Sequence, residues 1–443
     1  MTRIRIPLLP IVLVLLVLIA PAARSQAQAE QLTLSQAVTL ALEQNSQVLQ
    51  ARESIAGSTA KVSESRSAEY PLVNVSASYA RVGPIASYTV AIGPMFPPIT
   101  MKFGVENTYS AGVNIQHSLF NWGRTQAGID ISEAGLRLSE SSLELARQSV
   151  AYQVIQTFYG ILVSHEAVDV LSQSITSLES RLKTVRSRFD AGLASNFDVL
   201  TIEVQIANVR SRKVDTESNL RRLELLFNRF TGRPINSPVS LKGDLLYHSF
   251  ATDPARLFQT ATEKRRELEQ LKHQETLAFA QMKLTNSLDK PNVNLSLTWG
   301  LRNGYMPNLD VLRGNWNAGV VLVYPLFDGF KTRNQLDQAD VNIHLAQMRY
   351  EDVRNAVSME VNQSLVDLQA NEEKIRIEEL KVRQAEEALK IADERYAKGL
   401  LSTIDLLDSQ TSLESARLNL LQATYSAIIS KYNLDKAVGV VPF

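Results

Sequence analysis

Apolar and polar residues alternate strictly in four short stretches of the chain. In Val73–Tyr79 the apolar side chains fall on odd positions and the polar ones on even positions, and the same alternation recurs near Val113, Leu297 and Val320. A period of two is typical of strands with one apolar and one polar face. The pattern predicts strands over about residues 72–82, 107–120, 292–302 and 315–327.

Elsewhere the apolar positions follow the three-and-four spacing of amphipathic helices. The spacing predicts a helix over residues 32–69 and another over 255–288, each ending before a proline. Residues 124–190 contain no proline, so a single helix there would be about 100 Å long. A narrow apolar seam then continues through Val199, Ile202, Ile206 and Val209, as in a coiled coil.

Two similar segments separate the long helical patterns. Residues 188–200 read RFDAGLASNFDVL and residues 395–407 read RYAKGLLSTIDLL, with a constant offset of 207 (405 − 198). Glycine suits the left-handed position after a helix, and serine with a following aspartate suits the start of the next one. Residues 188–200 and 395–408 are therefore predicted to be the tips of two helical hairpins.

The rest of the chain is duplicated in the same way. LFNWGRT (119–125) and LFDGFKT (326–332) keep the offset of 207, whereas Pro71 and Pro291 differ by 220. The strand–strand loop of the first half, rich in Gly and Pro over residues 83–98, is therefore 13 residues longer than that of the second. The sequence predicts one body over 30–443 with two repeats, about 30–235 and 254–443.

The N-terminus has the pattern of a secretory signal. Arg3 and Arg5 precede the apolar run Ile11–Ala20, and Ala27-Gln28-Ala29 offers a cleavage site. Residues 1–29 are therefore predicted to be a signal peptide. The chain contains no cysteine, which excludes disulfides and a lipidated N-terminal cysteine.

Four alternating strands cannot close a membrane barrel, because the smallest known barrels use about eight. Open edges in lipid would leave backbone groups unpaired at a cost of several kcal/mol each. Other copies of the chain are expected to complete the sheet: two copies would give eight strands and three would give twelve. Asn74, Asn114, Asn292 and Asn294 on the polar faces suit a wet interior, and the long helices are expected to project into the periplasm.

Composition and motifs give no case for an enzyme. The 46 basic and 46 acidic residues leave no bulk charge that would attract nucleic acid. The five histidines are scattered, and no zinc-protease, phosphate-loop or nucleophile-elbow motif is present. No cofactor and no metal site is expected.

The acids of the second tip differ from those of the first. Asp405 and Asp408 lie three residues apart in the first turn of a predicted helix, so both project from one face. Complementing the helix dipole explains Asp198 and Asp405 equally well. It does not explain Asp408, whose counterpart in the first copy is Thr201.

Over residues 32–440 the chain resembles the TolC-like outer-membrane efflux protein family. The resemblance rests on YPLVNV (70–75) and KPNVNL (290–295), on LFNWGR and LFDGFK, and on both tips. It implies a homotrimer in the outer membrane of a Gram-negative-type bacterium, with a twelve-stranded membrane β-barrel continuing into a twelve-helix periplasmic tunnel. The tips would dock a periplasmic adaptor and, through it, an inner-membrane pump of the RND or ABC type, for efflux or type I secretion.

The resemblance also implies roles for tip residues. Asp405 and Asp408 would form carboxylate rings that gate the tunnel, and Tyr396 would hold the closed state by bonding Asp198. Leu401 occupies the place of a family arginine, so an arginine-based lock is absent. The rim that packs against the adaptor would comprise Gly192, Leu193, Ser195, Gly399, Leu400 and Ser402.

Two alternatives remain open from the residues alone. A soluble periplasmic coiled-coil scaffold would require the alternating strands to be hairpins outside the membrane. A general porin would have no need of such long helices.

Overall fold

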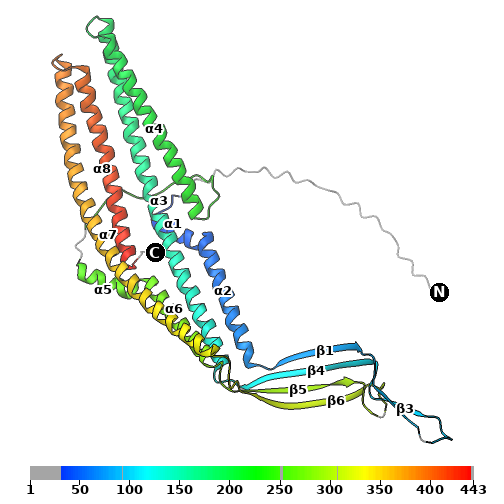
Figure 1. The fold of residues 1–443 in the computed structure, drawn as a ribbon. Helices are drawn as coiled ribbons and strands as arrows, with labels where there is room; N and C mark the ends of the chain where they lie inside the picture. The colour runs from blue at the N-terminus through cyan, green and yellow to red at the C-terminus, as the bar shows by residue number, and fades with distance from the viewer. Residues whose placement is uncertain (1–30, 92, 250–252, 307, 441–443) are drawn as a thin grey trace, which may run out of the picture.

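The computed structural model describes residues 31–91, 93–249, 253–306 and 308–440. The chain is elongated, with long helices at one end and a sheet at the other (Figure 1). The predicted signal peptide, residues 1–29, lies outside the described residues.

Two helical hairpins form the long arm of the molecule. Helix α3 (Arg124–Asp190) and helix α7 (Lys331–Ala397) have 67 residues each, and they are followed by α4 (Asn196–Phe230) and α8 (Thr403–Val438). The bounds of α3 coincide with the predicted helix. The predicted seam of α4 is buried against α3, in a cluster of Leu171, Leu178, Val185, Val199, Ile202, Ile206, Val209 and Leu407.

Four shorter helices flank the hairpins: α1 (Leu34–Gln44), α2 (Ser46–Arg66), α5 (Pro254–Lys264) and α6 (Arg266–Asn286). The prediction of one continuous helix over 32–69, and of another over 255–288, is therefore wrong. The first breaks at Asn45, whose extended backbone lets its side chain accept a hydrogen bond from the Gln47 N–H at 2.8 Å. Its amide also donates to the carbonyl of Phe230 at 2.9 Å.

The second break falls at Arg265, whose side chain is only 8% exposed. The guanidinium donates to the carbonyls of Lys436 and Ala437 at 3.3 and 3.2 Å, at the end of α8, and pairs with Glu360 at 2.8 Å. The last carbonyls of a helix have no partner within it. Arg265 supplies that partner, and this fixes the end of α8 against α5 and α6.

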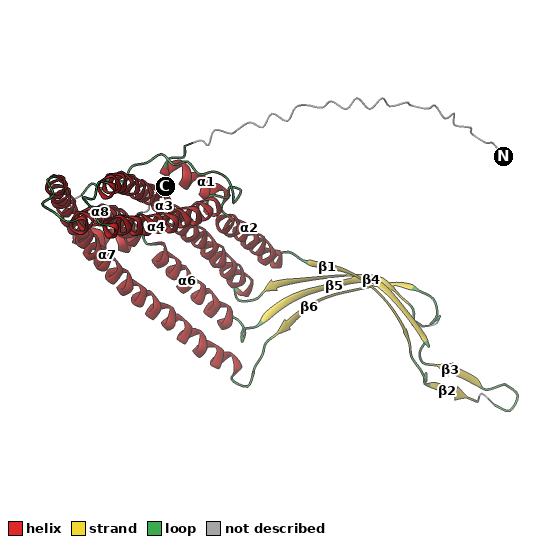
Figure 2. Cartoon of the chain, turned by 90° about the horizontal axis from the view of Figure 1, so that it is seen from above, coloured by secondary structure: helices red, strands yellow, loops and turns green. Residues whose placement is uncertain are grey.

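The sheet has four antiparallel strands in the order β1-β4-β5-β6. They are β1 (Leu72–Arg81), β4 (Asn107–Phe120), β5 (Asn292–Arg302) and β6 (Arg313–Val323). Residues 83–98 were expected to form a loop. Instead, β2 (Ser87–Val90) within it pairs with β3 (Ile99–Lys102) as a separate hairpin beyond the sheet (Figure 2).

The strand register separates an apolar face from a polar one. Val75 lies opposite Val113, Val113 opposite Trp299, and Trp299 opposite Trp316, all on one face. On the other face Asn114 bonds the hydroxyls of Ser76 and Thr298 at 3.0 and 2.8 Å. The predicted division into two faces is confirmed. The apolar face has no cover within the described chain, and Val75 is 81% exposed.

Two glycines meet at the same level of the sheet, where Gly112 lies opposite Gly300. A Cβ atom at Gly300 would lie 2.3 Å from the carbonyl oxygen of Ala111 and 2.7 Å from the Cα of Gly112. Both neighbours are backbone atoms, so no side chain can move aside. Only glycine allows this close approach between β4 and β5.

We expect Gly300→Val to destabilise the protein by about 1–3 kcal/mol, because the added atoms displace the backbone of β4. The matched control is Gly314→Val in β6, where a Cβ has no neighbour within 4 Å. The free energy of unfolding in detergent, measured by urea titration, would check this. Equal losses in the two variants would contradict it.

Candidate functional site

The first tip joins α3 to α4 through a tight turn. Gly192 has φ +74°, and the N–H of Leu193 donates to the carbonyl of Arg188 at 2.8 Å. The hydroxyl of Ser195 accepts a hydrogen bond from the N–H of Asp198 at 3.2 Å, and the Asp198 carboxylate accepts one from the N–H of Ser195 at 3.0 Å. Such reciprocal capping closes the first turn of α4.

The second tip repeats this turn between α7 and α8. Gly399 has φ +73°, and Ser402 caps α8 by accepting from the N–H of Asp405 at 3.2 Å. The hydroxyl of Ser402 donates to the carboxylate of Asp405 at 2.6 Å. Leu193 and Leu400 are 80% and 73% exposed. The predicted rim residues therefore form the two turns, with a leucine side chain in water at each.

The two predicted latch residues are connected through a third residue. The hydroxyl of Tyr396 lies 3.4 Å from the hydroxyl of Thr403. Hydrogen bonds from the hydroxyls of Ser195 and Thr403 hold the pKa of the Asp198 carboxyl below its usual value. Arg188 lies over the Tyr396 ring, 4.9 Å from its centre. Thr403 and Arg188 are not recognisable from the sequence as contact residues, because nothing in their spacing indicates a contact between the tips.

The two predicted gate residues occupy different surroundings. The Asp405 carboxylate is engaged at the cap of α8, whereas Asp408 lies on the wall of a groove of about 400 Å³ between α4 and α8. The groove is lined by Phe197, Leu200, Thr201, Val204, Gln205, Ile404, Leu407, Asp408 and Thr411. Asp408 and its counterpart Thr201 thus line the same groove. The two repeats differ at this position, and Asp408 is the one acidic residue among the described residues that line the groove.

A buried carboxylate fastens the two hairpins together behind the tips. Glu414 of α8 is 4% exposed, and its side chain accepts a hydrogen bond from the hydroxyl of Ser174 in α3. Its other oxygen lies 2.7 Å from the guanidinium of Arg212 in α4. A charge taken out of water in this way must be paired. Glu414 is not recognisable from the sequence as a buried residue, since an acid on a long helix is usually solvated.

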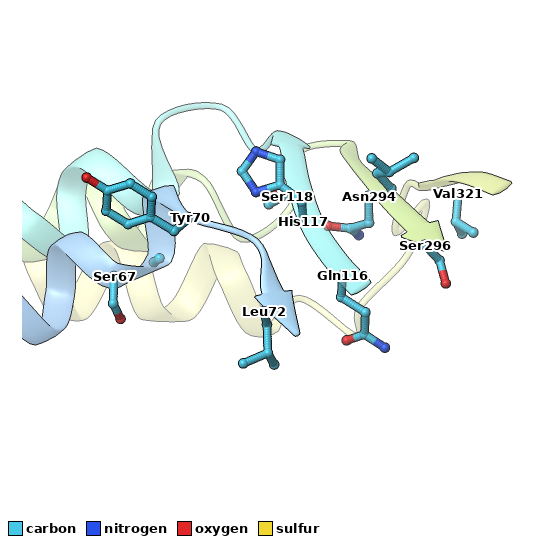
Figure 3. A pocket seen from close by; sticks show the side chains of 11 residues that line it. Ser67, Tyr70, Leu72, Gln116, His117, Ser118, Asn294, Ser296 and Val321 are labelled. Atoms are coloured by element: carbon cyan, nitrogen blue, oxygen red, sulfur yellow. The ribbon is translucent and has the colours of Figure 1, made fainter. Parts of the chain in front are cut away.

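A cavity of about 590 Å³ lies at the junction of sheet and helices. Figure 3 shows Tyr70 and His117 on one side of the sheet there, with Leu72, Gln116 and Ser296 on the other. The cavity lining holds no acid and no cysteine. Among the described residues no group of three His, Cys, Asp or Glu side chains could hold a metal ion.

The model of the outer membrane efflux protein family matches residues 37–232 and 257–440, which is most of the chain. The chain belongs to the outer membrane efflux protein family. The outer membrane protein TolC of Salmonella enteritidis is 25% identical over 290 residues, covering 62% of this chain and 58% of that protein. TolC of Escherichia coli K12 is 24% identical over 293 residues, covering 62% and 59%. The chain thus matches less than three fifths of the length of these relatives.

Solved structures of bacterial outer membrane proteins show the same fold. The CmeC outer membrane channel of Campylobacter jejuni superposes with a TM-score of 0.78 at 18% identity, covering 92% of this chain and 85% of that one. VceC of Vibrio cholerae gives a TM-score of 0.75 at 17% identity, covering 92% and 96%. The fold of this efflux protein is TolC-like.

Family membership places the efflux protein in the outer membrane of a Gram-negative bacterium. This location overturns the alternative of a soluble periplasmic scaffold. None of the helices in the described residues is long and apolar enough to cross a membrane.

Aromatic side chains mark both ends of the apolar sheet face. Tyr79 and Tyr109 lie 5.2 Å apart at the outer end, and the Trp299–Trp316 pair lies at the level of Val113, four residues closer to the helices. At the helix end lie the pairs Phe120–Trp122 and Phe327–Phe330, with centroid distances of 5.3 and 5.4 Å. Tyrosine and tryptophan favour the two membrane–water interfaces. The rise from Trp316 to Tyr324 is about 27 Å along the chain, comparable with the apolar band of a membrane-spanning sheet.

We expect Arg212→Ala to destabilise the efflux protein by about 2–3 kcal/mol, because it leaves the Glu414 carboxylate buried without its cation. The matched control is Arg210→Ala, which removes an exposed pair with Glu179 and should cost less than about 1 kcal/mol. Urea unfolding followed by circular dichroism would compare them. Similar losses in the two variants would show that the Arg212–Glu414 pair is worth no more than an exposed ion pair.

Proposed function

We propose that the protein is one subunit of a trimeric exit duct of the outer membrane, serving efflux or secretion. Each copy would contribute its two repeats, so that three copies give a twelve-stranded barrel and a twelve-helix periplasmic tunnel. The relatives named above are outer membrane efflux proteins and channels, which supports the duct. The tips would dock a periplasmic adaptor, which links the duct to an inner-membrane pump.

The observation that carries this proposal is the sheet with open edges. β1 and β6 each pair on one side only, while the apolar face stays exposed. In hydrocarbon the free edge groups would cost several kcal/mol each. Copies of the chain can satisfy both edges, because β1 runs away from the helices and β6 runs back toward them. Twelve strands also fall within the range of known outer-membrane barrels.

The tips support docking and gating. Leu193 and Leu400 present apolar surface on two rigid turns, which suits packing against an adaptor hairpin. Asp408 faces the groove at the tip without an ion pair in the described residues. Three copies would bring three such carboxylates, with those of Asp405, around one axis, where like charges favour cations. Tyr396, Thr403 and Asp198 would hold the closed state.

The duct predicts both an oligomeric state and a conductance. Detergent-purified protein should have the mass of three copies by light scattering, and it should form ion-conducting pores in planar bilayers. A monomer, or a trimer without conductance, would end this proposal.

If Asp405 and Asp408 gate the duct, the double variant Asp405→Asn/Asp408→Asn should be blocked less strongly by cations. We expect block by multivalent cations from the tip side to weaken by at least about tenfold, equivalent to 1.4 kcal/mol of lost attraction. Asparagine keeps a polar oxygen at the cap of α8, so the turn should persist. Asp190→Asn, at the end of α3 in the first tip, is the matched control and should leave block unchanged. Unaltered block in the double variant would remove both residues from the pore.

A further inference from the structure

The longer strand–strand connection of the first half is an apolar hairpin in an exposed place. It rises from the outer ends of β1 and β4, at the far end of the sheet from the helices (Figure 1). Residues 82–101 contain no Asp, Glu, Lys, Arg or His. Met95, Phe96 and Tyr88 are 92%, 66% and 63% exposed. A contiguous apolar surface of this kind indicates a partner.

The chain itself does not provide that partner. In the described residues β2 and β3 pair only with each other, and they leave the sheet at an angle (Figure 2). Two backbone hydrogen bonds lie where the hairpin joins the sheet. The N–H of Val82 donates to the carbonyl of Glu106 at 2.8 Å, next to the β1–β4 pairing, and the N–H of Phe103 donates to the carbonyl of Ala86 at 2.9 Å, next to the β2–β3 pairing. A two-stranded hairpin alone is marginally stable in water. Its order therefore depends on a surface outside the chain.

A second apolar surface lies at the same end of the sheet. The turn between β5 and β6, residues 303–312, has Asp310 as its one charged residue. Met306, Leu312 and Val311 in it are 67%, 52% and 50% exposed. The hairpin of the same chain therefore leaves this turn largely uncovered.

The strand order allows a second copy to cover it, since in a ring of copies the turn lies beside β1 of the next copy as well as beside the hairpin of its own chain. The free edges are β1 and β6, so a closed ring of copies places β1 of one copy beside β6 of the next. The hairpin begins where β1 ends, and the turn 303–312 ends where β6 begins. A ring that pairs these edges brings the hairpin of one copy to the turn of its neighbour.

Membrane hydrocarbon is a poor alternative cover. The outer ends of β1, β5 and β6 carry Arg81, Arg302 and Arg313. Arginine belongs at the level of the lipid headgroups. The hairpin starts beyond this level, on the aqueous side.

We propose that the β2–β3 hairpin of each copy packs on the 303–312 turn of the next copy, as an apolar strap that fastens the ring at its outer end. This rests on the proposed assembly of copies around a duct. The contact is heterologous, since it joins two different surfaces.

Cross-linking tests the contact cleanly because the chain has no cysteine. Tyr88→Cys and Met95→Cys would each be combined with Val311→Cys in the full-length protein and treated with a bis-maleimide reagent. Only a heterologous contact can link three copies covalently, because each copy then reacts at two different sites. We expect covalent dimers and trimers from at least one double variant, and none from Val311→Cys alone. Met95→Cys with Asp244→Cys, an exposed site near the helices, is the control and should give none.

Two outcomes would overturn the strap. Covalent dimers from Met95→Cys alone would show that hairpins meet one another on the axis instead. The second outcome is that no cross-links form and that nitroxide-labelled lipid quenches a fluorophore attached to Met95→Cys. This result would assign the hairpin to the membrane. The mass of each variant in detergent is measured first, so a missing trimer counts against the duct. An intact trimer without the double-variant cross-links counts against the strap alone.

Discussion

The unpaired edges of the four-stranded sheet are the constraint on which the rest of the structure depends. The edge strand β1 is exposed on both faces in the single chain, and none of the three buried clusters includes a residue of the four-stranded sheet. These buried clusters lie among the helices, and the first of them contains Phe158 and Phe227. The sheet therefore has no buried cluster of its own among the described residues. The proposed assembly would supply lipid against one face and other copies at its edges, whereas the helices already bury their apolar seams within one chain.

Near-symmetry of the two halves makes their differences informative. α4 and α8 have 35 and 36 residues and nearly identical capped tips. With the offset of 207, however, Asp408 and Glu414 of α8 correspond to Thr201 and Ala207 of α4. One of the two additional acids lines the groove and the other is buried between the hairpins. The second hairpin thus carries two acids that the first lacks at these positions, and the first supplies Ser174 and Arg212 as partners of one of them.

The sequence predicted the regular elements because their determinants are local. Period-two alternation defined the strands, the absence of proline defined α3, and Gly192 and Gly399 defined the tips. The errors have tertiary causes. The break at Arg265 is stabilised by carbonyls of α8 far along the chain, and the buried role of Glu414 requires Ser174 and Arg212 to converge on it. The β2–β3 hairpin was missed because its Gly and Pro residues conceal strands of only four residues.

Polar contacts join the two hairpins at several levels. At the tips Thr403 bonds the carboxylate of Asp198 and Arg188 lies over the ring of Tyr396, and each contact is worth about 1 kcal/mol. Glu414 lies nine residues after Asp405, about 14 Å along α8. Separating the hairpins at this level would leave its carboxylate buried without Ser174 and Arg212. The guanidinium of Arg181 in α3 also pairs with both carboxylate oxygens of Asp393 in α7, on the tip side of Glu414. Parting the two hairpins anywhere behind their turns therefore separates charges that are at least partly removed from water.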